Sequence, residues 1–270
     1  MSSIKNNLID IGVNLTGKSF QKDRVQVIEQ AQLAGVEYIG VTGTNLQHSD
    51  AATELCEQYP SVLFSTAGVH PHHADEWGNK TAQEIYSMAQ VDCVKAVGEC
   101  GLDYNRNFSD PKAQRQCFEA QLELAADLKL PVFLHQRDAH DDFIKILKRW
   151  RDQLSGGVAH CFTGTVIEVK AYLELDLMIG VTGWICDERR GQSLQQAVKD
   201  IPIERLMIET DAPYLLPRDL PENLSINLKN RRNEPQVLPH VCAALAFYKD
   251  MSEQDVAFQT TLQAKAFFSL

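Results

Sequence analysis

Five short apolar runs of this sequence each stop at a histidine or a carboxylate, and this pattern constrains the fold more than any other feature. The runs end at His70, Glu99, His135, His160 and Asp211. Burying an unpaired carboxylate at the end of an apolar strand is costly unless it meets a cation or a metal ion. The chain therefore needs a fold that brings the ends of separate strands together.

The apolar runs alternate with segments of helical periodicity along the whole chain. Strands are predicted at residues 8–13, 36–42, 62–69, 94–104, 131–134, 157–159, 176–182 and 205–208. Helices are predicted near residues 25–33, 46–59 and 81–88, from residue 111 onward, and at 238–248 and 253–268. Ser109-Asp110-Pro111 is a typical helix start, because it offers a capping residue followed by proline in the first turn.

Eight strand–helix units in 270 residues predict one domain, residues 1–270, with the fold of a (β/α)₈ TIM barrel and an extra C-terminal helix. A doubly wound open sheet is the alternative. The barrel is favoured because the carboxyl ends of all its strands converge on one face, where the polar residues would meet. An open sheet would spread them along a line.

Composition narrows the class of protein further. The formal charge of −10 argues against a protein that coats duplex nucleic acid with a basic face. The seven cysteines are scattered without a C-x-x-C pair, which favours reduced thiols and a cytoplasmic location. No signal peptide and no apolar run of membrane-spanning length is visible, so we expect no membrane association.

Glu99, His135, His160 and Asp211 are predicted to bind a metal ion. A single histidine at a strand end is usually a hydrogen-bonded structural residue. Two histidines and two carboxylates, all in that position, favour a shared site. Mixed imidazole and carboxylate ligands suit zinc, manganese or iron, and carboxylates with water suit magnesium.

Six motifs in chain order resemble the TatD family of metal-dependent deoxyribonucleases. They are GVHPH at 68–72, GECGLDY at 98–104, PVFLHQRDA at 131–139, HCFTG at 160–164, ETDAPY at 209–214 and RNEP at 232–235. DIGVNL at 10–15 and CDERRG at 186–191 resemble the subgroup for which the family is named more closely than its paralogues.

The resemblance implies a hydrolase barrel of the amidohydrolase type that acts as a 3′→5′ exonuclease on single-stranded DNA, with RNA as a further candidate substrate. It implies a role in DNA repair or turnover. The expected cofactor is a divalent metal ion, Mg²⁺ first, with Mn²⁺ or Zn²⁺ able to use the same site. We expect a monomer without an obligate protein partner.

One departure from the family pattern affects the metal site. Most of the family opens with a His-x-His pair on the first strand, where this chain has Gly12 and Asn14. Glu99, His135 and His160 are retained, so we expect one well-held metal ion with Asp211 nearby. A second ion would bind more weakly, and restoring the two histidines should strengthen it. Glu99 and Asp211 are the predicted catalytic residues, with Asp211 as general base.

The remaining candidates would bind phosphate or orient ligands. The predicted phosphate contacts are His70, His72, Arg137, Arg189, Arg190 and Arg232, with Arg231 in the same loop. A local basic rim would let an acidic protein accept DNA. Trp184 beside it could stack on a base or pack between loops. Asp103 and Asn14 are predicted to support the ligands.

Two other functions stay open at this point. The same barrel could hydrolyse amides or esters, including the acyl bond of misacylated transfer RNA. It could also be a nucleic-acid-binding barrel with weakened catalysis. Intact Glu99, His135, His160 and Asp211 argue against the second, since buried polar residues destabilise a fold that does not use them.

Overall fold

The strands form one eight-stranded parallel sheet whose order follows the sequence from β1 to β8. The computed structural model describes residues 7–221 and 232–270 of the protein. The strands are β1 Leu8–Val13, β2 Val36–Val41, β3 Leu63–Ala67, β4 Val94–Asp103, β5 Val132–Arg137, β6 Gly157–Ala159, β7 Met178–Val181 and β8 Leu206–Ile208. The α-helices of the described residues are α1 Arg24–Leu33, α2 Leu46–Gln58, α3 Asn79–Met88, α4 Pro111–Leu128, α5 His140–Trp150, α6 Val166–Glu174, α7 Gln192–Asp200, α8 Leu238–Lys249 and α9 Glu253–Phe268. Short 3₁₀ helices are η1 Lys18–Phe20, η2 Pro71–Glu76, η3 Arg151–Gln153, η4 Gly183–Cys186, η5 Ile203–Arg205 and η7 Pro235–Val237.

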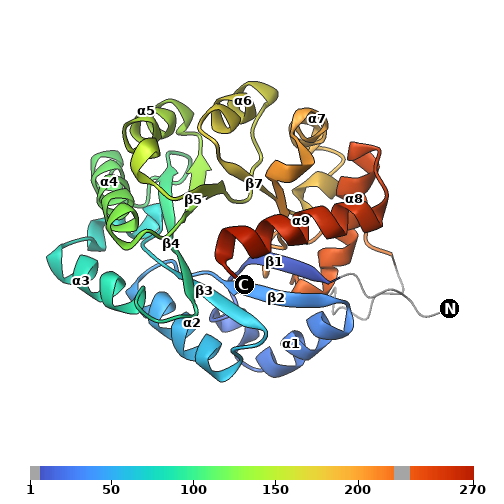
Figure 1. The fold of residues 1–270 in the computed structure, drawn as a ribbon, viewed down its shortest axis with the longest axis horizontal. Helices are drawn as coiled ribbons and strands as arrows, with labels where there is room; N and C mark the ends of the chain where they lie inside the picture. Colours follow the sequence, from blue (N-terminus) through green and yellow to red (C-terminus); the bar gives the residue numbers. More distant parts are fainter. Residues whose placement is uncertain (1–6, 222–231) are drawn as a thin grey trace.

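The sheet closes where β1 meets the segment after β8. Val13 forms a parallel bridge with Ala212. The backbone N–H of Asn14 donates to the oxygen of Ala212 at 2.8 Å, and that of Asp211 donates to the oxygen of Gly12 at 3.0 Å. Figure 1 shows α1 to α8 in a ring around the strands. The predicted (β/α)₈ barrel is confirmed, and the open sheet is excluded.

Alternating side chains of each strand face two different apolar layers. In β4, Val97 and Leu102 point outward and belong to the same cluster as Phe118 and Leu122 of α4, whereas Ala96 faces the barrel interior. Burying one such leucine or phenylalanine side chain contributes roughly 1.5–3 kcal/mol. The outer layer therefore fixes each helix on its strand.

Helix α9 closes the amino-terminal end of the barrel. The Phe268 ring lies 4.7 Å from the ring of Phe64, and Lys265 pairs at 2.8 Å with Glu37 near the start of β2. Figure 1 shows α9 crossing in front of β1. This is the predicted extra helix. The sequence did not predict that it would cover the inward-facing residues at this end of the barrel, as a plug. The inward-facing residues that cluster with Ala264 and Phe268 are Ile9, Ile11, Phe64, Ala96, Phe133, Val158, Met178 and Met207.

Strand β5 is longer than the sequence predicts. The expected strand stops one residue before His135, but the observed pairing continues to Arg137. The cause is β4, which runs beside it and places Gly101 opposite His135 and Asp103 opposite Arg137. His135 therefore lies inside a strand, where backbone hydrogen bonds fix its position.

Across residues 7–221 and 232–270, no helix combines the length and the apolar character needed to cross a membrane. The expected cytoplasmic location stays a prediction.

Candidate active site

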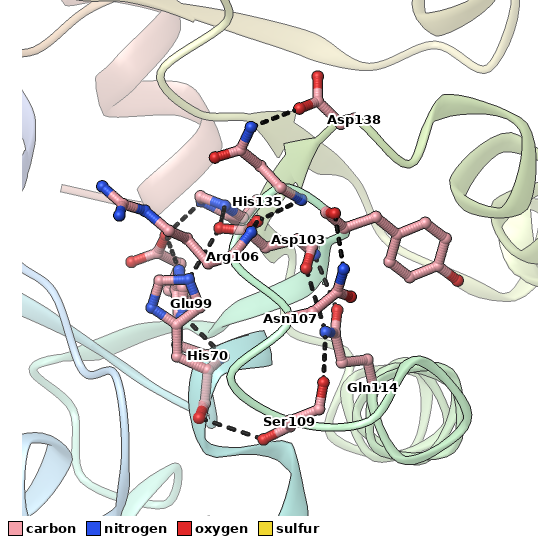
Figure 2. Close-up of polar contacts among 12 residues, drawn as sticks. His70, Glu99, Asp103, Arg106, Asn107, Ser109, Gln114, His135 and Asp138 are labelled. Atoms are coloured by element: carbon pink, nitrogen blue, oxygen red, sulfur yellow. Dashed lines mark hydrogen bonds and ion pairs between the residues drawn. The ribbon is translucent and has the colours of Figure 1, made fainter.

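Glu99 is the centre of a cluster of buried polar side chains at the carboxyl end of the barrel. Its Oε1 lies 2.9 Å from His135 Nδ1, 2.9 Å from His160 Nε2 and 3.4 Å from His70 Nε2. Figure 2 shows Glu99, His70 and His135 close together at this end of the strands. The four side chains come from four consecutive strands or the residues that follow them, so the barrel brings together what the sequence separates.

A bulge in β4 directs Glu99 inward. Gly98 and Cys100 pair with consecutive residues of β5, so Glu99 is an extra residue in the ladder. Bulges of this kind re-aim side chains beside active sites. Gly101 follows with a φ of +146°, and a Cβ there would lie 1.9 Å from the backbone oxygen of His135. The glycine thus lets β4 approach β5 closely just beyond the carboxylate.

The histidines determine the charge of Glu99. Burial alone would raise the pKa of Glu99, but nearby His160 and His70 hold it well below its usual value. Burial lowers the pKa of His70 to about 4, against the attraction of Glu99. Burial acts in the same direction on His160, yet Glu209 and Glu99 raise its pKa well above the ordinary value. At neutral pH the ionised Glu99 therefore lies beside a neutral His70, whereas His160 must lose a proton before it can bind a cation.

Glu209 supports His160 from behind, a role that the sequence analysis did not assign. Its Oε2 lies 3.1 Å from His160 Nδ1, and its Oε1 accepts the backbone N–H of Cys161. The side chain is fully buried. A carboxylate behind a metal-binding histidine fixes the tautomer and orientation of the ring. The available signal was its position directly after β8, one residue before Thr210 and two before Asp211.

Gly12 and Gly180 leave the space that the Glu209 carboxylate fills. A Cβ at either glycine would lie 2.4 Å from a carboxylate oxygen of Glu209. Restoring a histidine at position 12 to strengthen a second ion therefore also requires the Glu209 carboxylate to move.

Asp211 follows β8 and is held by Asn14, whose Nδ2 donates to Asp211 Oδ1 at 3.4 Å. Burial raises the pKa of Asp211 to about 7, against the attraction of His160 and with the repulsion of Glu209. The carboxyl group can thus exchange a proton near neutral pH.

Asp103 organises the loop after β4, as Figure 2 shows. Its Oδ2 lies 2.7 Å from His72 Nε2 and 3.6 Å from His135 Nε2. Its Oδ1 accepts the backbone N–H groups of Asn105 and Arg106 at 2.9 and 2.8 Å. Burial would raise the pKa of Asp103, but the two histidines hold it below its usual value. Asp103 therefore links His72 and His135 to the same loop.

The predicted phosphate-binding arginines differ in how free their guanidinium groups are. Arg137 is exposed, and Arg189 is exposed with its Nε 3.7 Å from carboxylate oxygens of Asp187 and Glu188. Arg190 pairs with Asp187 at 3.0 Å and stacks over the ring of Trp184 at 4.3 Å. Trp184 in turn donates its Nε1–H to the backbone oxygen of Arg190, so this tryptophan packs within the loop.

Arg232 is not free. Its guanidinium donates to both carboxylate oxygens of Asp23, at 2.9 and 2.7 Å, and also to Glu234. A phosphate contact through Arg232 would have to break these ion pairs, so the predicted role does not fit its surroundings. Arg231 lies outside the described residues.

The cluster around Glu99 fits a divalent metal ion. One ligand atom from each of His70, Glu99 and His135 lies within 4.8 Å of the others. His135 Nε2 is buried without a hydrogen-bond partner, because its 3.6 Å separation from Asp103 is too long for a hydrogen bond. Imidazole and carboxylate together are typical ligands of zinc, manganese and iron.

The sequence is similar to known proteins over nearly its whole length. Residues 9–269 match the family described as TatD related DNase. A protein of Erwinia tasmaniensis named "3′-5′ ssDNA/RNA exonuclease TatD" is 51% identical over 263 residues, which cover 97% of this chain and 100% of that protein.

Solved structures are also similar to this chain over nearly its whole length. A hydrolase of the TatD family from Entamoeba histolytica is 28% identical with a TM-score of 0.89, covering 98% of this chain and 99% of that one. YJJV, a TATD homolog from Escherichia coli, is 26% identical with a TM-score of 0.88, covering 99% of this chain and 100% of that one.

Proposed function

The chain belongs to the TatD-related DNase family, and we propose that it is a metal-dependent exonuclease that removes nucleotides from the 3′ end of single-stranded DNA and RNA. The observation that carries the proposal is the convergence of His70, His135 and His160 on one oxygen of Glu99. Substrate and polarity rest on the relative from Erwinia tasmaniensis, which is named for that activity.

The metal ion would be held by the cluster around Glu99. Glu99, His135, His160 and Asp211 are the proposed ligands. His70 joins them because one of its ring nitrogens lies within 4.8 Å of ligand atoms of both Glu99 and His135. When bound, a divalent ion neutralises phosphoryl oxygens and lowers the pKa of a coordinated water. Mg²⁺ is the family expectation, whereas the imidazole-rich donor set favours Mn²⁺ or Zn²⁺.

Asp211 is the proposed general base. Its pKa of about 7 places it between the charged and neutral forms at neutral pH, which is where a general base works best. Asn14 holds one carboxylate oxygen, so the other is left to accept a proton from the attacking water. Glu209 keeps the His160 ring in place through its Nδ1.

The substrate phosphate would meet the side chains at the rim. His72 Nε2 lies 2.7 Å from Asp103 Oδ2. The His72 and Phe108 rings meet edge to face, with 4.8 Å between the ring centroids. Arg137 and Arg189 reach into solvent at the same end of the barrel. These groups would neutralise the strand next to the scissile bond.

A labelled single-stranded oligonucleotide tests the proposal. With Mg²⁺, Mn²⁺ or Zn²⁺, a 3′ label should be released at once as a mononucleotide, and a 5′ label should give progressively shorter products. EDTA should stop both. Cleavage that resists EDTA, or that persists in Glu99→Gln protein purified in parallel, would contradict a metal-dependent reaction.

Asp211→Asn tests the proposed base separately. Turnover per bound metal ion should fall by about 10²–10⁴-fold. Unchanged turnover at equal metal content would remove Asp211 from this role.

Parallel assays with misacylated transfer RNA and of oligonucleotide binding separate the other two functions. Loss of an acyl group from misacylated transfer RNA without oligonucleotide cleavage would point to an ester hydrolase, and tight binding without either reaction to a binding protein. A role in DNA repair or turnover, the single domain and the monomeric state stay predictions.

A further inference from the structure

Cys186, Asp219 and His240 form a second cluster of metal-ligating side chains, away from Glu99. Cys186 ends η4 after β7, Asp219 follows β8, and His240 lies in the first turn of α8. One ligand atom from each lies within 4.8 Å of the other two. His240 Nε2 is 2.7 Å from Asp219 Oδ1. Three segments that are distant in sequence thus meet through a thiol, a carboxylate and an imidazole.

A cation would change the protonation of the Cys186 thiol. Cys186 is buried, and burial together with the negative charge of Asp219 raises the pKa of its thiol. A divalent ion reverses this effect, because a coordinating thiol loses its proton outright. The two acidic groups would then attract the same ion instead of opposing each other.

We propose that Cys186, Asp219 and His240 bind a zinc ion, with water as the fourth ligand. Thiolate, imidazole and carboxylate are all zinc ligands, and the thiolate disfavours magnesium. Bond lengths of about 2.0–2.3 Å place tetrahedral ligand atoms roughly 3.3–3.8 Å apart, so Asp219 Oδ1 and His240 Nε2, now 2.7 Å apart, would have to separate slightly. Asp219 can supply that movement, because its side chain is 57% exposed.

Zinc here would join the two loops that carry basic side chains. Next to Cys186, Asp187 accepts the backbone N–H groups of Arg189 and Arg190 and pairs with the Arg190 guanidinium. Next to Asp219, Arg218 pairs with Glu188, so the two loops already touch.

The ion would fasten this contact to α8 through His240. The proposed role of this zinc ion is structural and does not depend on the nuclease reaction.

Cobalt titration distinguishes this site from the one around Glu99, because the proposed ligands there include no sulfur. The protein used is the full chain carrying Glu99→Ala and His135→Ala, which removes two proposed ligands of the first site. It should bind one Co²⁺ per chain with thiolate-to-cobalt charge-transfer absorption, and Zn²⁺ should displace the cobalt. Absence of that absorption would overturn the proposal.

Adding Cys186→Ser should abolish the absorption and weaken Zn²⁺ binding by at least tenfold. Cys242→Ser is the matched control, since Cys242 is a buried thiol of α8 two residues from His240, and it should leave both signals unchanged. If Cys186→Ser fails to fold, His240→Gln tests the site with the thiol in place. Zn²⁺ affinity should again fall at least tenfold, and an unchanged affinity would contradict the assignment.

Discussion

The two ends of the barrel share the same eight strands and carry opposite chemistry. At the amino-terminal end, Phe268 of α9 packs on Phe64 inside a wholly apolar layer. At the carboxyl-terminal end, Glu99 is buried with His70 and His160 beside the half-buried His135, and Glu209 lies behind His160.

The difference separates stability from function. Apolar area buried at the base favours folding by about 25 cal/mol per Å². Charges buried at the mouth cost desolvation energy that their mutual attraction only partly offsets. We therefore expect substitutions at the base to change the free energy of unfolding and substitutions at the mouth to change catalysis and metal binding.

The largest expected effect is at the mouth. Glu99→Gln should reduce exonuclease turnover by roughly 10³-fold or more, a loss of about 4 kcal/mol of transition-state stabilisation, because three histidines lose their common partner. Metal content by mass spectrometry should fall with it, while the melting temperature changes little. A variant that unfolds as it loses activity would contradict the separation of the two ends.

The next effect is at the base. Phe268→Ala should lower the free energy of unfolding by about 3–5 kcal/mol through the cavity it leaves, measured by urea denaturation. Activity per folded molecule should stay unchanged. Phe258→Ala on the same helix is the matched control, since that ring is largely exposed, and it should change stability by less than about 0.5 kcal/mol.

A smaller effect is expected where Glu209 supports His160. Glu209→Gln should weaken metal binding or activity by about 10–100-fold, as titration calorimetry and the oligonucleotide assay would show. Gly12→Ala should act in the same way, because its Cβ displaces the Glu209 carboxylate. The two changes combined should cost little more than either alone, and full additivity would mean that they act independently.

The smallest effect is at the rim. Arg137→Ala with Arg189→Ala should weaken binding of single-stranded DNA severalfold, since both side chains are exposed. It should also reduce the slope of log affinity against log salt by about 1.4, near 0.7 for each lost phosphate contact. Arg232→Ala should leave the slope unchanged because Asp23 and Glu234 already hold that guanidinium. A reduced slope in Arg232→Ala would return it to the phosphate-binding set.

Local patterns were sufficient to predict most elements and the face where the site lies. Apolar runs and caps are short-range signals, so α9 was predicted with its observed bounds and Asp110 caps α4 as expected. His70, Glu99, His135 and His160 could be grouped because a barrel places all strand ends on one face.

The missed features depend on contacts between residues far apart in the chain. Glu209 fills space that Gly12 and Gly180 leave, and Arg232 pairs with Asp23 across 209 positions. Neither spacing nor periodicity reports such a contact. The plug made by α9 was missed for the same reason, since the inward-facing residues it covers are contributed by different strands.

The plug also orders events during synthesis. Residues 253–268 leave the ribosome only after every strand has been made, and Thr261 then bonds the backbone oxygen of Asn7 at 2.6 Å, 254 positions away. Until that helix docks, the nascent chain presents a ring of apolar side chains at the base of an unsealed barrel. Such a ring is the kind of surface that chaperones bind and that aggregation exploits. Ribosome-bound chains stopped shortly before α9 should therefore hold chaperones longer than chains that include it.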